Sequence, residues 1–191
     1  MSNLLRADTR PWRDKRARVR ACCATTWTSR AEPAWNVPFI RSLGVRHWLL
    51  KTEPGSYGWD DLVRDGATEW DGVRNHAAAA HLRAMAPGDA ALVYHSGEAK
   101  AAVGIARVAR GPRRDGAEGD WVSVAIEPVA PLPQPVTLKA MKADPALKGM
   151  AMLRQSRLSV SPVTAAEWQA IARLSAPPAT DGPREPADRR D

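Results

Sequence analysis

Four short clusters of polar and aromatic residues in this sequence carry side chains that could bind a ligand. They occupy residues 47–54, 70–75, 94–97 and 154–160, next to the ends of predicted strands. Loops held on a rigid sheet are where binding sites are usually built. The candidate binding residues are Trp48, Lys51, Thr52, Glu53, Pro54, Trp70, Asp71, Val73, Arg74, Asn75, Tyr94, His95, Ser96, Arg154, Gln155, Arg157, Leu158 and Ser159.

The residue types in these clusters suit stacking, hydrogen bonding and phosphate binding. Residues 70–75 place an aromatic ring, a carboxylate and a guanidinium directly before a predicted helix N-terminus, where acceptor groups bind well. Each cluster alone also fits an ordinary structural role, because a tryptophan usually packs in the core and Arg and Asp near turns usually form surface pairs. Four such clusters in one small domain favour a binding site.

The sequence contains no recognisable catalytic signature. It has no glycine-rich phosphate loop, no G-x-S-x-G, no H-E-x-x-H and no C-x-x-C. Its two cysteines, Cys22 and Cys23, are adjacent and lie in the N-terminal tail, and the four histidines lack metal-ligand spacing. We therefore expect no enzymatic activity, no cofactor and no bound metal.

Two alternatives stay open at this point. A nucleotide- or nucleic-acid-modifying enzyme would need a general acid or base, for which Glu53, Asp71 and His95 are the candidates. A protein-interaction module would instead need an exposed apolar patch.

The formal net charge of +7 is concentrated at the N-terminus. Residues 1–47 hold ten of the 28 basic residues and three acidic ones, whereas residues 48–191 hold 18 of each sign. Residues 1–45 also lack a hydrophobic period, and residues 176–191 are rich in proline and charge, so we predict two disordered tails. The first tail fits either a basic arm that touches nucleic acid or a dispensable extension.

The location and the oligomeric state follow from what the chain lacks. No run of apolar residues approaches a membrane span, and the N-terminus has no apolar core of the signal-peptide type. The adjacent cysteine pair gives no disulfide framework, which indicates a reducing compartment. We expect a cytoplasmic protein that is a monomer and does not contact a membrane.

The hydrophobic pattern between the tails predicts five strands and four helices. The expected strands are residues 45–51, 90–95, 102–109, 121–129 and 158–163, with a polar turn at 111–120. The expected helices are residues 59–64, 75–85, 137–143 and 164–174. Most connections are short, which favours a curved, largely antiparallel sheet or small barrel with helices packed against it.

In their order and spacing the four clusters closely resemble the EVE domain family. The resemblance covers residues 46–175, nearly the whole part of the chain that is expected to fold. It implies the fold of the PUA-like superfamily, an α+β domain whose curved, mostly antiparallel sheet closes into a small β-barrel with flanking helices.

The resemblance also implies a partner and a role for the clusters. EVE domains are thought to read a modified base in DNA or RNA, and they resemble YTH domains, which hold a methylated adenine in an aromatic pocket. On this basis we predict that a base stacks on Trp70. We expect the base edge to meet Thr52, Asn75 and Ser96, and the phosphates to meet Lys51, Arg74, Arg154 and Arg157.

Overall fold

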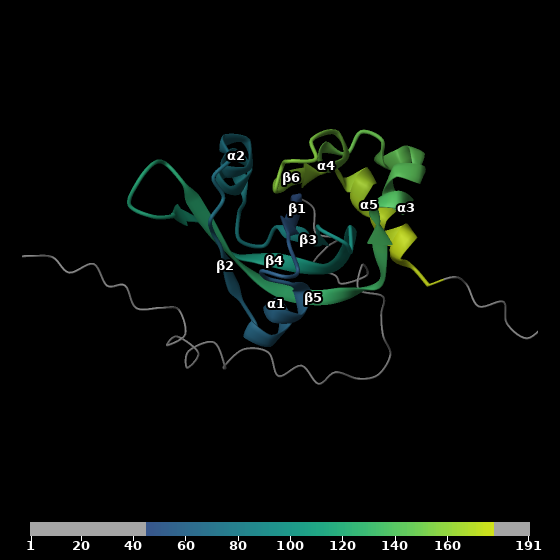
Figure 1. Cartoon of the computed structure of the whole chain (residues 1–191), viewed down its shortest axis with the longest axis horizontal. Coiled ribbons are helices and arrows are strands. Elements are labelled where there is room, and N and C mark those ends of the chain that lie inside the picture. Colours follow the sequence, from purple (N-terminus) through teal and green to yellow (C-terminus); the bar gives the residue numbers. More distant parts are fainter. Residues whose placement is uncertain (1–44, 178–191) are drawn as a thin grey trace, which may run out of the picture. The chain divides into compact units, whose positions relative to one another are not determined.

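The computed structural model describes residues 45–177, which form one mixed sheet with helices packed against it (Figure 1). The expected tails, 1–45 and 176–191, lie almost entirely outside the described residues. The elements are β1 (His47–Thr52), α1 (Trp59–Asp65), β2 (Thr68–Trp70), α2 (His76–Ala84), β3 (Ala90–His95), β4 (Ala101–Arg114), β5 (Val122–Thr137), α3 (Leu138–Ala143), the 3-10 helix η4 (Pro145–Leu147), α4 (Ala151–Arg154), β6 (Val160–Val163) and α5 (Ala165–Ser175).

The six strands lie in the order β2-β5-β4-β3-β1-β6. Only β1 and β3 are parallel, and the chain between them supplies α1, β2 and α2. The other neighbours are antiparallel. The α+β class and the mostly antiparallel sheet are confirmed. The expected closure into a barrel is not supported, because β2 and β6 are the two edges of an open sheet.

Both faces of the sheet are covered, which explains the uninterrupted apolar runs at residues 48–50 of β1 and 90–94 of β3. Successive side chains of a strand point to opposite faces. In β1, Leu49 joins a core with Trp168 and Ile171 of α5. Its neighbour Leu50 joins a second core on the other face, with residues of α1 and α2 that include Leu62 and Leu82.

Among the helices within residues 45–177, none has both the length and the hydrophobicity that a membrane span requires.

Helix ends follow the chemistry expected from the sequence. Gly66 ends α1 in the left-handed region at φ 73°, a conformation that glycine adopts without strain. The Asn75 side chain accepts a hydrogen bond from the Ala78 amide and caps α2. Thr164 and Glu167 form the predicted capping box of α5.

One glycine allows α1 to approach the sheet closely. A Cβ atom placed on Gly104 in β4 would lie 2.5 Å from ring carbons of Trp59. Trp59 begins α1 and is 8% exposed, so its indole fills the space that a side chain at 104 would need. The close contact fixes α1 against β4.

The structure extends or adds several elements relative to the sequence expectation. β4 and β5 continue to Arg114 and Thr137 through bulged registers, so the expected turn at 111–120 is partly strand. β2, η4 and α4 were not predicted, because three or four residues are too few to show a hydrophobic period. β6 begins at Val160, two residues later than expected.

Candidate nucleic-acid interface

One end of the sheet gathers most of the predicted site. The register pairs Thr52 of β1 with His95 of β3, and His95 in turn with Ala101 of β4. On the other side of β1, the Lys51 amide donates to the Ser159 carbonyl at 2.8 Å, just before β6. Three of the four sequence clusters therefore meet at this end.

A lysine side chain fixes the loop before β6 to β1. Lys51 Nζ donates to the Ser156 carbonyl at 2.7 Å, across 105 residues of sequence. Leu158 anchors the same loop, since it is only 5% exposed and packs in the core beside α1 and α2. The loop is thus held at both its main chain and its side chains.

An open pocket of about 320 Å³ lies between this loop and the beginning of α2. Its lining joins the second sequence cluster to the fourth. The lining residues are Asn75, Ala77, Arg154, Gln155, Ser156, Arg157 and Leu158. A volume of this order lies at the lower end of what small-ligand sites use.

The pocket offers hydrogen-bond donors that the protein itself does not use. The oxygen of the Asn75 side chain caps α2 at 3.0 Å from the Ala78 amide, and its amide nitrogen has no partner among residues 45–177. The exposed side chains of Arg154, Gln155 and Arg157 likewise make no hydrogen bond or ion pair within the described residues. Such groups are available for the edge of a base and for phosphate oxygens.

The loop before α2 is tied to the hairpin between β4 and β5. Arg74 pairs with Asp115 at 2.6 Å, and the Gly72 amide donates to the same carboxylate at 3.0 Å. The Arg74 hydrogen bond lowers the pKa of Asp115, with a smaller effect from Gly72. Burial raises the pKa of the neighbouring Asp71, and the charges of Asp115 and Glu69 raise it further.

An aromatic side chain that the sequence analysis did not select lies beside this loop. The Trp121 ring is 4.9 Å from the His76 ring, centroid to centroid, and the Arg74 guanidinium lies 5.7 Å from the Trp121 centroid. His76 directly follows the pocket residue Asn75. The sequence pattern places Trp121 only at the start of an expected strand. Nothing in its local sequence shows that the hairpin between β4 and β5 folds back over α2.

Trp70 lies in β2, opposite Val124 of β5, and is partly buried against the core beside α1 and α2. It is not among the residues that line the pocket. The preceding residue, Glu69, accepts hydrogen bonds from Arg110 and Ser123. Burial opposes ionisation of Glu69, but these bonds outweigh it and lower its pKa.

Three other candidates are core residues. Trp48 is 4% exposed, and its indole N–H donates to Asp89 at 2.9 Å. Val73 and Tyr94 are 7% and 2% exposed. The structure does not bring these three side chains into the pocket.

The polar residues at the ends of β1 and β3 build a turn rather than an open site. Thr52 Oγ1 donates to the Tyr57 carbonyl at 2.7 Å, and Ser96 Oγ donates to the Thr52 carbonyl at 2.9 Å. Glu53 and Pro54 lie exposed at its start, and the carbonyl of Glu53 accepts from the Tyr57 amide.

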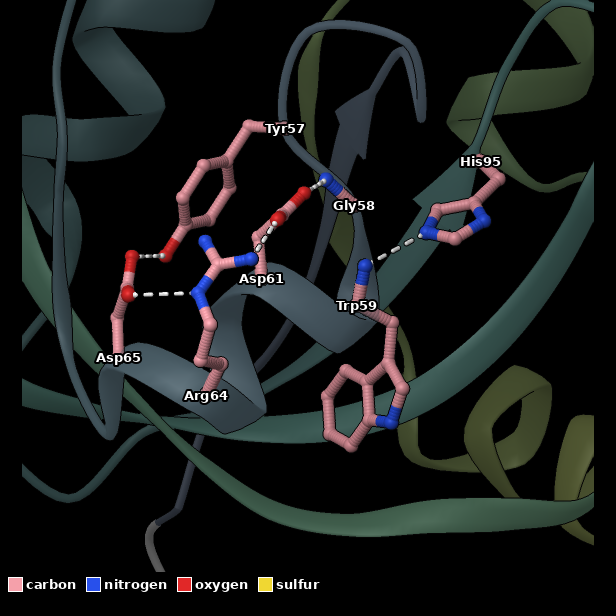
Figure 2. A network of polar contacts seen from close by, with 7 residues as sticks. All are labelled: Tyr57, Gly58, Trp59, Asp61, Arg64, Asp65 and His95. Atoms are coloured by element: carbon pink, nitrogen blue, oxygen red, sulfur yellow. Dashed lines mark hydrogen bonds and ion pairs between the residues drawn. The ribbon is translucent and has the colours of Figure 1, made fainter.

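His95 connects this turn to α1 (Figure 2). Its Nε2 accepts a hydrogen bond from the Trp59 amide at 3.0 Å, so the ring is neutral there. Burial lowers the pKa of His95, and the charge of Asp60 opposes that effect in part. In the same network Arg64 pairs with Asp61 at 2.7 Å and with Asp65 at 3.3 Å.

Among residues 45–177, no group of three or more His, Cys, Asp or Glu side chains is arranged to hold a metal ion.

The fold and the pocket together define a small α+β module with an open pocket lined by amide and guanidinium side chains. A family model described as "EVE domain" matches residues 46–174, and the chain belongs to the EVE domain family. Thymocyte nuclear protein 1 of Gallus gallus is 30% identical over 164 residues, which cover 67% of this chain and 68% of that protein.

Solved structures support the same assignment. The NMR structure of a Rhodopseudomonas palustris protein is 47% identical, with a TM-score of 0.66 over 69% of this chain and 93% of that one. A crystal structure from Agrobacterium tumefaciens is 38% identical, with a TM-score of 0.67 over the same shares. Human THYN1 protein, in complex with 5-methylcytosine containing DNA, is 26% identical, with a TM-score of 0.64 over 68% of this chain and 97% of that one.

Proposed function

We propose that this protein binds DNA and reads a modified base in the pocket between α2 and residues 154–158. The observation that carries the proposal is the pocket itself, which joins two sequence clusters and offers donors without partners. The human relative in complex with DNA that contains 5-methylcytosine supports DNA as the ligand. We also propose that the protein binds DNA as a monomer.

In this proposal the lining residues divide into two roles. The amide groups of Asn75 and Gln155 meet the edge of the base, where an unmatched buried polar group costs about 1 to 3 kcal/mol. Arg154 and Arg157 meet the flanking phosphates, which position the strand without reading its sequence. Lys51 acts as a positioning residue, because its ammonium group is already bonded to the Ser156 carbonyl.

The stacking wall in this proposal comes from a tryptophan beside the pocket, since the lining itself has no aromatic ring. Trp70 and Trp121 are the two partly exposed tryptophans among residues 45–177. Trp121 has the stronger support, because it contacts both neighbours of Asn75 in the sequence, Arg74 and His76. Stacking on such a ring is worth about 1 to 3 kcal/mol per base.

We propose a binding role without catalysis. Of the three acid or base candidates, His95 uses Nε2 to accept from the Trp59 amide, and Glu53 lies in an exposed turn. Asp71 has a raised pKa, which is the one observation in favour of an enzyme. Product formed from a modified oligonucleotide, and lost in Asp71→Asn, would establish the enzymatic alternative.

The experiment that tests the proposal is a titration of the full chain with DNA that contains 5-methylcytosine and with the same DNA unmodified. We expect tighter binding of the modified DNA. Arg154→Gln and Arg157→Gln should weaken binding of both DNAs, whereas Gln155→Ala should mainly reduce the difference between them. Equal affinity for both DNAs in the unsubstituted protein would contradict this reading of the ligand, and preference for a modified RNA would replace DNA with RNA.

A further inference from the structure

A second open pocket, of about 370 Å³, lies at the junction of three segments. These are the turn before β4, the end of β5 and the helix α3. Its lining is formed mainly by carbon atoms, and it includes three lysines and no acidic residue. The lining residues are Ala99, Lys100, Thr137, Leu138, Lys139 and Lys142.

The backbone holds these segments together. The Leu138 amide donates to the Lys100 carbonyl at 2.7 Å, and Ala101 is the register partner of Thr137. Lys100 has a φ of 42°, an uncommon left-handed conformation for a residue with a side chain. Lys139 and Lys142 are three residues apart in α3 and therefore share one face of that helix.

The three ammonium groups have no hydrogen-bond or ion-pair partner among residues 45–177. In the same part of the chain six arginines pair with carboxylates: Arg46, Arg64, Arg74, Arg83, Arg107 and Arg110. Three exposed, unpaired lysines on adjoining segments make this part of the surface positive, and a positive surface attracts anions.

This pocket lies at the same end of the sheet as the first one, but beside α3, which packs in the core on the face opposite to α2. DNA that contacts both pockets therefore passes across the end of the sheet. The register runs from Thr52 to His95, then to Ala101 and to Thr137, and the loop before β6 adjoins β1 on the other side. Neighbouring strands are about 4.8 Å apart, so the four intervals from β6 to β5 span about 19 Å. Along one strand of B-form DNA this span corresponds to about five or six nucleotides, at about 3.4 Å each.

We infer that Lys100, Lys139 and Lys142 bind the phosphate backbone of the same DNA, about five nucleotides from the base held in the first pocket. The inference rests on the proposed function in taking DNA as the ligand, and the stated spacing also takes the first pocket as the place of the base. Three flexible, exposed ammonium groups suit the repeated charges of a backbone, which they contact without reading sequence.

The test compares Lys142→Gln and the double variant Lys139→Gln/Lys142→Gln with the unsubstituted chain. Glutamine keeps the helix propensity of lysine and removes its charge. Affinity is measured for a duplex of about 20 base pairs between about 50 and 200 mM salt. Arg173→Gln in α5 removes the same charge from an exposed position outside the pocket and is the control for Lys142→Gln.

A plot of log affinity against log salt has a negative slope. Each phosphate contact that is lost should reduce the magnitude of this slope by about 0.9. We expect a loss of about one unit for Lys142→Gln and about two for the double variant, with no change for Arg173→Gln. A duplex of about 8 base pairs centred on the modified base ends before this pocket. On that duplex the lysine variants and the unsubstituted chain should have the same affinity and the same salt dependence. An unchanged slope on the long duplex, or an equal loss in Arg173→Gln, would overturn the inference.

The preference for modified over unmodified DNA is recorded in the same titrations. If the preference is absent but the affinity of the lysine variants still depends less on salt, the proposed base reading fails and the phosphate site stands. If the preference is present and the slope is unchanged, the phosphate site fails and the base reading stands.

Discussion

Lys51 Nζ donates to the Ser156 carbonyl at 2.7 Å and so joins the end of β1 to the loop that lines the pocket. The contact comes from the first and fourth sequence clusters, which are far apart in the chain. Lys51 is the last residue but one of β1, and its long, flexible side chain can reach over the strand end to the neighbouring loop.

The first prediction concerns this contact. Lys51→Met keeps the length of the side chain and removes its donor, so residues 154–158 should become more mobile while the fold is retained. One exposed hydrogen bond contributes only about 1 kcal/mol to stability. Amide hydrogen exchange should be faster in the loop, and binding of modified DNA should be weaker. Unchanged exchange in the loop would show that Leu158 alone fixes it.

The second prediction separates the two tryptophans. Trp121→Ala should leave the core intact and weaken binding of modified DNA by about 1 to 3 kcal/mol, because it removes the proposed stacking surface. Trp70→Ala should instead mainly lower the free energy of unfolding, by about 2 kcal/mol, because Trp70 packs partly against the core. Both variants are measured by denaturant unfolding and by titration with DNA. A stable Trp70→Ala protein that no longer distinguishes modified from unmodified DNA would show that the base stacks on Trp70 and not on Trp121.

The third prediction concerns pH. The pKa of His95 is lowered by burial in the folded state, so between that pKa and the ordinary value of 6.5 the unfolded chain binds more protons. Stability due to neutral His95 is therefore present above pH 6.5 and is lost as the pH falls through the folded pKa. His95→Gln can still accept from the Trp59 amide but does not titrate in this range.

We therefore expect the free energy of unfolding to fall less steeply between about pH 7 and 5 in His95→Gln than in the unsubstituted protein. Some slope should remain, because burial also lowers the pKa values of His47 and His81. Identical pH dependence in both proteins would show that His95 does not supply the effect.

The fourth prediction concerns the close contact of α1 with β4. Gly104→Ala puts a methyl group into the space that the Trp59 ring occupies, so either the ring or the helix must move. Overpacking of this kind costs about 1 to 3 kcal/mol of stability. A matched control is Gly55→Ala, where nothing lies within 4 Å of the added carbon. Equal stability of the two variants would contradict the packing described.

Much of the fold was predictable because its signals are local. The capping residues Asn75 and Thr164 mark the starts of α2 and α5, and the apolar run at 90–95 coincides with β3. The open sheet was not predictable in this way, because closure depends on whether the two edge strands meet. The sequence pattern also placed the end of this strand at residue 129, whereas β5 continues to Thr137 through Pro131, Pro133 and Pro135, with bulges in its pairing to β4.

The site was predicted in part for the same reason. The sequence identified Asn75, Arg154, Gln155, Arg157 and Leu158, and the structure brings all five to one pocket. The sequence did not distinguish core aromatic residues such as Trp48 from partly exposed ones, because the type of a residue does not determine whether its side chain is buried. It also missed Trp121 and the lysines of the second pocket, whose proximity depends on pairings between distant strands.

The most direct test of the base pocket uses Asn75→Asp. Aspartate caps a helix as well as asparagine does, so α2 should remain intact, but the variant loses the amide donor and gains a negative charge in the pocket. Asn75→Ser keeps a capping oxygen without the added charge and serves as the control for electrostatic repulsion.

The quantity to measure is the ratio of Kd for unmodified DNA to Kd for DNA with 5-methylcytosine, for the unsubstituted chain and for both variants. We predict a ratio clearly above one for the unsubstituted chain and a ratio near one for both variants, with little change in thermal stability. A variant ratio equal to that of the unsubstituted protein would contradict the placement of base recognition between α2 and residues 154–158.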